Sequence, residues 1–258
     1  YDPDLNGDGI PDVIAAPSEM DTVLFLFLDR DGSVLPSSTF PFQEFNAHTG
    51  VAPDLGRSVA NIGAIDGNGV GDVAIGTTGE FALIVLLEID GSGAVQETYS
   101  RKMSGSEGDY TLSGTLDGFA THVYAAGDVN GDGITDLIIS DPLTDCVSGG
   151  AASDCGRSIL FFLEWTGTAV QVRSYHSYMT YGHVNDYLAG FPFGLNGGLQ
   201  VAPAASIGDV DNNGVRDVAI GTQNQGKLFI LLLDSNGYVS SGKEIEYTEV
   251  PGADDKFG

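Results

Sequence analysis

The chain has 258 residues, of which 42% are hydrophobic, so it can bury a substantial core and is not a disordered segment. Its 36 acidic residues outnumber its 10 basic ones, and the net charge of −26 disfavours nucleic acids and anionic lipid as partners while favouring bound cations. No apolar run approaches the roughly 20 residues of a membrane-spanning helix, so the sequence predicts no membrane span in this segment.

Four related acidic segments recur along the chain at steps of roughly sixty to eighty residues. In chain order they read DLNGDGIPD, AIDGNGVGD, DVNGDGITD and DVDNNGVRD. We call them acidic loops one to four, and they occupy Asp4–Asp12, Ala64–Asp72, Asp128–Asp136 and Asp209–Asp217. Internal repetition of this kind indicates an architecture built from similar supersecondary units.

Two apolar runs follow every acidic loop. The short run begins at residue 13, 73, 137 or 218, and the longer one occupies residues 22–28, 81–89, 158–165 or 227–233. The longer runs are apolar throughout rather than alternating, so both of their faces must be covered. A hairpin turn and a more polar strand come next, and one further strand precedes the loop, most clearly at residues 56–63 and 200–208.

The repeating unit is therefore four antiparallel strands, A to D, with the acidic loop between A and B. Such units predict an all-β fold, a β-propeller of four-stranded antiparallel blades. We expect a single propeller region over residues 1–258. Its repeats fall at approximately 1–50, 51–115, 116–195 and 196–250, and residues 251–258 begin a further repeat.

The acidic loops predict calcium sites. Oxygen ligands at alternate positions of a tight loop converge on one hard cation, a glycine permits the turn, and so many protein oxygens favour calcium over magnesium. In three loops the expected ligands are four side chains and one main-chain carbonyl. They are Asp4, Asn6, Asp8, Asp12 and the Ile10 carbonyl; Asp128, Asn130, Asp132, Asp136 and the Ile134 carbonyl; and Asp209, Asp211, Asn213, Asp217 and the Val215 carbonyl.

Acidic loop two departs from this pattern because Ala64 occupies its first position. The remaining ligands are Asp66, Asn68, Asp72 and the Val70 carbonyl, and we expect this site to be weak or empty. The alternative for all four loops is a turn rich in Asp, Asn and Gly that needs no metal. Mutual repulsion of the crowded carboxylates argues against that alternative.

The two cysteines, Cys146 and Cys155, are separated by a loop rich in Gly, Ser and Ala. This spacing favours a local disulfide and an oxidising compartment, and two free thiols are the alternative.

A long connection after the third repeat, from about residue 178 to 200, is rich in aromatic residues. These side chains are candidates for a surface that binds a glycan or a protein, and the alternative is that they fold over the blade edge and are buried. The candidates are Tyr178, Tyr181, His183, Tyr187, Phe191 and Phe193. The motifs HExxH and GxSxG, a P-loop and a GxGxxG segment between strand and helix are missing, so we expect no catalytic residues and no enzymatic activity.

The repeats resemble the FG-GAP repeats of integrin α-subunit propellers and their microbial relatives. The resemblance rests on LGRSVANIGAIDGNGVGDVAIGTT from Leu55, on DLIISDP from Asp136 and on the pair Phe257–Gly258. It implies a calcium-bearing extracellular or cell-surface propeller used in adhesion or scaffolding. Integrin propellers have about seven blades, so we expect the four repeats to belong to a larger propeller; a small closed ring is the alternative.

The expected function is that of an extracellular calcium-binding adhesion or structural module. Its partner would be a protein or glycan at the cell surface or matrix, together with further blades or other chains of an assembly. One alternative is a propeller lectin that binds glycans through the aromatic connection. Another is a non-catalytic scaffold region of a larger secreted enzyme.

Overall fold

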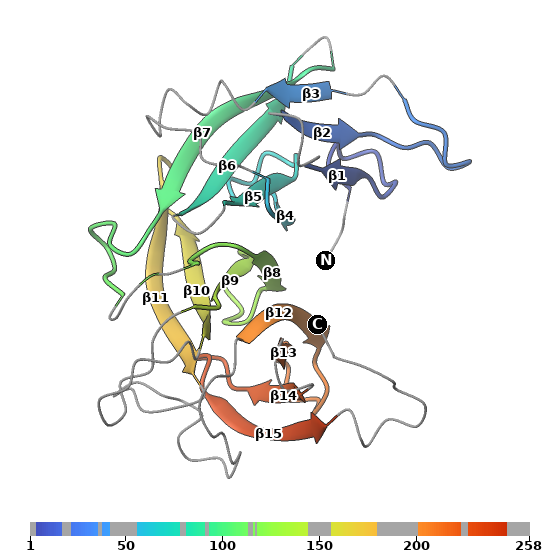
Figure 1. Ribbon diagram of the computed structural model, residues 1–258. Coiled ribbons are helices and arrows are strands. Elements are labelled where there is room, and N and C mark those ends of the chain that lie inside the picture. Colours follow the sequence, from blue (N-terminus) through green and yellow to red (C-terminus); the bar gives the residue numbers. More distant parts are fainter. Residues whose placement is uncertain are drawn as a thin grey trace.

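The computed structural model describes residues 4–16, 22–35, 38–41, 56–77, 81–90, 93–112, 116, 118–143, 156–179, 201–222 and 227–246. Within these residues the protein is all-β, with fifteen strands and no helix. The strands form four antiparallel sheets that follow one another along an arc (Figure 1). The predicted fold class is confirmed.

Each sheet consists of strands that are consecutive in the chain. Sheet one contains β1 (Val13–Ala15), β2 (Thr22–Leu26) and β3 (Ser38–Pro41). Sheet two contains β4 (Val59–Gly63), β5 (Asp72–Gly76), β6 (Ala82–Ile89) and β7 (Val95–Met103). Sheet three contains β8 (Val123–Gly127), β9 (Asp136–Asp141), β10 (Arg157–Trp165) and β11 (Val170–Met179). Sheet four contains β12 (Val201–Gly208), β13 (Asp217–Thr222), β14 (Lys227–Leu233) and β15 (Val239–Glu246).

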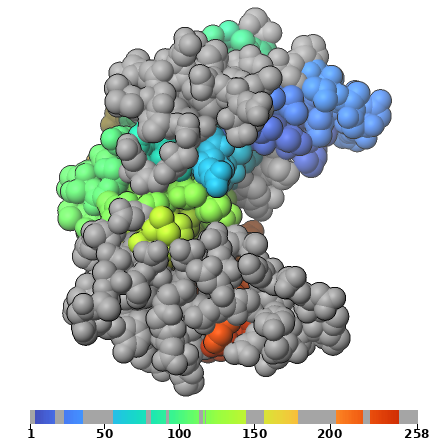
Figure 2. Space-filling model, viewed as in Figure 1, coloured from blue at the N-terminus to red at the C-terminus, as the bar shows by residue number. Residues whose placement is uncertain are grey.

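Successive sheets contact each other mainly through their innermost strands, with β1 against β4, β4 against β8 and β8 against β12. The sheets do not close into a ring (Figure 1). In the space-filling view the described residues of sheets one, two and three follow one another around the arc (Figure 2). This arrangement is that of consecutive propeller blades.

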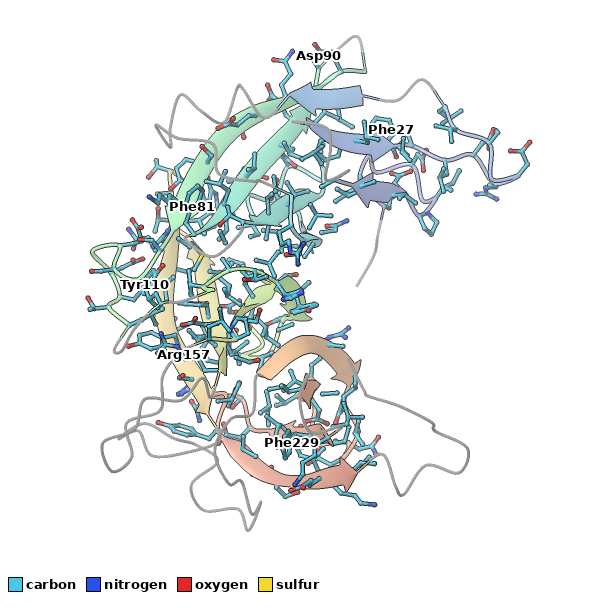
Figure 3. The ribbon with its side chains drawn as sticks, viewed as in Figure 1. Phe27, Phe81, Asp90, Tyr110, Arg157 and Phe229 are labelled. Carbon is cyan, nitrogen blue, oxygen red and sulfur yellow. The ribbon has the colours of Figure 1, made fainter. Side chains whose placement is uncertain are left out.

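Three hydrophobic clusters fill the spaces between successive sheets. In β6, Leu83 and Val85 face the cluster shared with sheet one, whereas Ile84 and Leu86 face the cluster shared with sheet three. In the same way, the side chains of β10 face alternately the cluster shared with sheet two and the cluster shared with sheet four. Phe229 of β14, labelled in Figure 3, belongs to the cluster between sheets three and four. The continuous apolar runs of these strands therefore follow from burial on both faces.

The acidic loops also contribute to packing between sheets. Gly127 ends β8 with a φ of 78°, and a Cβ placed on it would lie 2.4 Å from Arg216 Cδ of loop four. Gly63 ends β4 in the same conformation, and its Cβ would lie 3.5 Å from Thr135 Oγ1 of loop three. In both cases the residue that precedes the last aspartate of one loop lies against the previous sheet.

The chain contains no helix, within the described residues, that is long and apolar enough to cross a membrane.

Candidate metal centres in the acidic loops

The aspartate that ends each acidic loop is buried and accepts two backbone hydrogen bonds. One donor is the second residue of the same loop, and the other lies within two residues of the C-terminal end of the long apolar strand. The donors are Leu5 and Leu28 for Asp12 (2.9 and 2.9 Å), Ile65 and Leu87 for Asp72 (2.7 and 2.8 Å), Val129 and Leu163 for Asp136 (2.9 and 3.2 Å), and Val210 and Leu233 for Asp217 (2.7 and 2.9 Å). The closing aspartate thus ties strand C to the loop in all four repeats.

Burial raises the pKa of two of these closing carboxyls. The pKa of Asp72 rises to about 7 and that of Asp136 to about 8, because burial disfavours the charged form more than the backbone N–H groups favour it. Neighbouring carboxylates add to the shift, from Asp66 for Asp72 and from Asp132 and Asp128 for Asp136. A cation at the loop would favour the ionised form of each group.

The aspartate at the first position organises the turn of three loops. In loop three, Asp128 Oδ1 accepts the N–H groups of Gly131 (2.7 Å) and Asp132 (3.0 Å), and its Oδ2 accepts that of Gly133 (2.8 Å). Loop one repeats this pattern, with Asp4 accepting from Gly7, Asp8 and Gly9, and loop four has the N–H groups of Asn213 and Gly214 bound to Asp209. Oδ2 of Asp4 and of Asp128 accepts a single N–H and retains a second lone pair that could bind a cation.

Loop two lacks this side chain, and its turn is held differently. The N–H of Gly67 donates to the Ala64 carbonyl (3.1 Å), whereas the N–H of Asn68 donates to Asp66 Oδ1 (3.0 Å). The turn is therefore kept while one carboxylate is lost.

The fifth position separates the loops into two pairs. In loops two and four it is an asparagine, and Nδ2 of Asn68 and of Asn213 donates to the carbonyl of Leu87 (2.6 Å) and of Leu233 (2.8 Å). In loops one and three it is Asp8 or Asp132, which accepts the N–H of the seventh residue, Ile10 or Ile134, and the side-chain amide of Asn6 or Asn130. In loops two and four, the N–H of Val70 or Val215 is bound by the asparagine Oδ1. In all four loops, the residue whose carbonyl is a predicted ligand therefore donates its own N–H to the side chain of the fifth residue of that loop.

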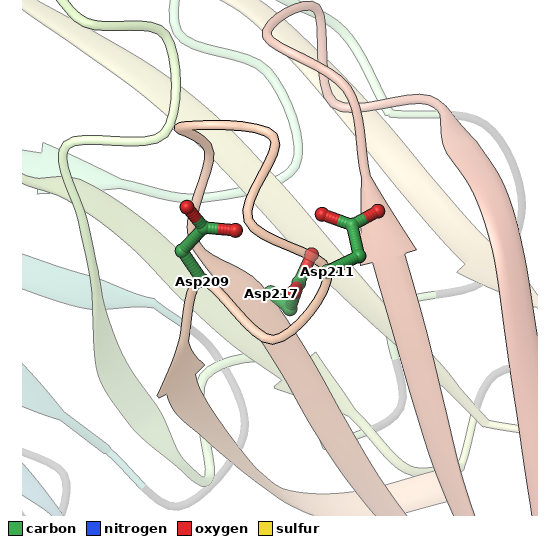
Figure 4. A group of neighbouring side chains, drawn as sticks. All are labelled: Asp209, Asp211 and Asp217. Atoms are coloured by element: carbon green, nitrogen blue, oxygen red, sulfur yellow. The ribbon is translucent and has the colours of Figure 1, made fainter.

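Loop four brings three predicted ligands together. The carboxylates of Asp209, Asp211 and Asp217 each place an oxygen within 4.8 Å of the others (Figure 4). Two oxygens that bind one Ca²⁺ at 2.3–2.6 Å lie at most about 5 Å apart. The hard oxygen donors and their spacing therefore fit a calcium ion, with Asp217 buried and the other two exposed.

Tyr178 does not belong to an exposed aromatic surface, and that prediction is wrong. The strand β11 continues to Met179, and Tyr178 pairs with Ser158 of β10. The side chain is 1% exposed, and its hydroxyl donates to the Gly237 carbonyl (2.8 Å). The other predicted surface residues, Tyr181, His183, Tyr187, Phe191 and Phe193, lie outside the described residues, as do Cys146 and Cys155.

Comparison with known proteins gives a weak likeness to characterised proteins that agrees with this architecture. No protein-family model matches the chain. Among characterised proteins, it is similar to integrin alpha-4 of Xenopus laevis, with 26% identity over 149 residues. The match covers 55% of this chain and 14% of that protein, so the chain corresponds to a small part of its relative. An integrin alpha-like relationship is the conclusion that this likeness supports.

Proposed function

We propose that the chain is an extracellular calcium-binding β-propeller region that serves as an adhesion or structural interaction module. The proposal rests chiefly on loop four, where three carboxylates approach within 4.8 Å at one end of a blade. Two further sites are proposed in loops one and three, where the first aspartate accepts turn N–H groups as Asp209 does in loop four. The similarity to integrin alpha-4 supports the cell-surface role and a protein partner.

Calcium would act on stability rather than on chemistry. The closing aspartate already holds the loop to strand C, as in loop four, where Asp217 accepts from Val210 and Leu233. An ion shared by Asp209, Asp211 and Asp217 would neutralise their repulsion and fix the loop against the blade. The propeller would thereby present its connecting loops to a partner as a rigid surface.

The calcium part of the proposal is tested by titrating the chelator-treated chain with Ca²⁺ in a calorimeter. We expect about three sites with dissociation constants of roughly 10⁻⁴–10⁻³ M, the range of extracellular modules. The double variant Asp209→Asn, Asp211→Asn should lose one site. Asp31→Asn, which removes an exposed carboxylate from the turn after β2, is the matched control and should lose none. Binding heats that stay at the dilution level up to about 10⁻² M Ca²⁺ would refute it.

The adhesive part of the proposal needs a separate measurement. The chain, immobilised on beads, should retain cells or extracellular matrix in calcium and release them in a chelator. Equal retention in both conditions would show that adhesion does not depend on calcium bound to the acidic loops. No retention in calcium would refute the adhesive role.

A further inference from the structure

A cavity of about 390 Å³ lies between sheets three and four. One side is formed by Arg173, Ser174 and His176 of β11, and the other by Asn236 and Tyr238 in and after the turn that joins β14 to β15. The volume is within the range of small-molecule pockets.

The two walls are held in tight contact. A Cβ placed on Gly237 would lie 2.6 Å from His176 Cδ2 and 2.7 Å from Phe162 Cζ, so only glycine fits at this point of the turn. The Tyr178 hydroxyl donates to the carbonyl of the same glycine (2.8 Å). The turn of sheet four is therefore fixed against sheet three, and the pocket is formed before any ligand arrives.

A β-bulge places Arg173 at the pocket. Phe162 pairs with Ser174 and Leu163 with Val172, which leaves Arg173 as the extra residue of β11. The same bulge occurs in sheets two and four, where the extra residues are Thr98 and Ser240. Their hydroxyls donate to the opposite backbone carbonyls, those of Leu86 (3.2 Å) and Leu232 (3.0 Å). Bulges redirect side chains, and in sheet three alone among these the redirected side chain is a guanidinium that lines a cavity.

The charge of Arg173 is not neutralised by another part of the described structure. Among the described residues, the ion pairs join Arg101 to Asp109, Arg157 to Asp141 and Lys227 to Glu244, and none involves Arg173. A chain with a net charge of −26 offers many carboxylates for such a pair. A guanidinium that the bulge places at a pocket, with no ion pair to a described carboxylate, is suited to an anionic ligand.

Tyr238 supplies an aromatic wall that the equivalent turns lack. The turns after β2, β6 and β14 share one backbone hydrogen-bond pattern, in which the residue after the turn glycine is Ser33, Ala94 and Tyr238, respectively. The Tyr238 ring lies 4.7 Å from the His176 ring, centroid to centroid, and the side chain is still 44% exposed. A partly exposed aromatic ring of this kind can pack against the apolar face of a sugar.

We propose that this pocket binds a saccharide unit that carries a carboxylate, such as a uronic acid. Arg173 pairs with the carboxylate, and Tyr238 packs against the sugar ring. The hydroxyl of Ser174 and the amide of Asn236, which also line the cavity, bind the sugar hydroxyls. The site adds a ligand to the proposed interaction module.

The test is calorimetric titration of the calcium-saturated chain with glucuronic acid, galacturonic acid, glucose, galactose and acetate. We expect both or one of the uronic acids to bind at least about tenfold more tightly than the neutral sugars and acetate, the ratio expected of one charge-assisted hydrogen-bonded pair. Arg173→Gln should weaken uronic acid binding by about tenfold, and Tyr238→Ala by a similar factor, whereas Tyr238→Phe should keep most of it. Arg30→Gln, an equal change of charge in the exposed turn after β2, should bind like the native chain.

Melting temperatures of the variants near the native value would show that lost binding is not lost folding. Uronic acid binding by Arg173→Gln at native affinity would overturn the proposal, as would equal affinity for neutral sugars. Acetate binding as tight as that of the uronic acids would also overturn it, because the sugar ring would then contribute nothing. The proposal is also overturned if neither uronic acid binds at about 10⁻² M, a concentration far above the dissociation constants of useful sites.

Discussion

Acidic loops two and three have the same length and the same closing aspartate, but they differ at the first position. In loop three Asp128 accepts three N–H groups of the turn, whereas in loop two the Ala64 carbonyl accepts that of Gly67. Both turns nevertheless lead into fully buried strands, β5 and β9. The first aspartate is therefore dispensable for the fold of a blade.

The closing aspartate shows the opposite behaviour. Asp72 accepts the N–H groups of Ile65 and Leu87 in the loop that lacks the first carboxylate, as Asp136 accepts those of Val129 and Leu163 in the loop that has it. We infer that the closing aspartate is needed for the blade itself as well as for the proposed ion, whereas the first aspartate is needed chiefly for the ion. Four changes test this division, and they follow from the largest expected effect to the smallest.

Replacing the closing aspartate should destabilise both loops in the absence of calcium. Asp72→Ala and Asp136→Ala each leave two buried N–H groups without an acceptor, which costs about 2–6 kcal/mol of unfolding free energy. Urea unfolding in a chelator measures the loss, and Asp66→Ala, at an exposed carboxylate of loop two, is the control with an expected loss of about 1 kcal/mol or less. A small loss for Asp72→Ala would mean that its hydrogen bonds do not hold the blade.

Calcium should stabilise the native chain through the loops that have the first aspartate. At a hundredfold excess of calcium over the dissociation constant, each occupied site contributes about 2.7 kcal/mol. The calcium-dependent rise in melting temperature should therefore shrink in Asp128→Ala and remain nearly native in Asp66→Ala. An equal reduction in both variants would place an ion in loop two as well.

Restoring the missing carboxylate should convert loop two into a stronger site. Ala64→Asp offers an acceptor to the turn N–H groups, as Asp128 does, and should add about 1 kcal/mol of stability without calcium. Calorimetry should then detect one site more than in the native chain, because affinity grows with ligand charge. Ala64→Asn is the matched control, with the hydrogen bonds but without the charge. A site count unchanged by Ala64→Asp would show that loop two has the wrong shape for the ion.

The smallest change exchanges the fifth residue between the two kinds of loop. Asn68→Asp removes the donor to the Leu87 carbonyl (2.6 Å) and should cost about 1 kcal/mol in a chelator. Calcium should recover part of this loss in the double variant Ala64→Asp, Asn68→Asp, which reproduces the carboxylates of loop three. Higher stability of Asn68→Asp than of the native chain in a chelator would contradict the role of that hydrogen bond.

The strands and the acidic loops could be predicted because their signals are local. Runs such as residues 159–163 are apolar at every position, and only burial on both faces of a sheet accounts for such runs in short strands. The ligand positions of loop four follow from spacing alone, and Asp209, Asp211 and Asp217 do converge.

The features that sequence reasoning missed depend on residues that are distant in the chain. The closing aspartates were interpreted as ligands only, because their second donors, such as Leu87 for Asp72, are 15 or more residues away. Tyr178 was assigned to a surface because the end of β11 is set by pairing with Ser158 rather than by a local stop signal. The cavity beside Arg173 arises from a bulge and from the turn of the next sheet, and no single segment encodes it.

The residue that precedes the closing aspartate has a consequence for the whole arc. Gly71 lies where a Cβ would come within 2.9 Å of Leu5 Cδ2 in the previous repeat, and Arg216 fills the space over Gly127. Each of these loops thus reaches back to the preceding blade at one point, beside the hydrophobic cluster that fills the rest of the space. The fit between two blades is therefore specified by residues of that pair of repeats alone.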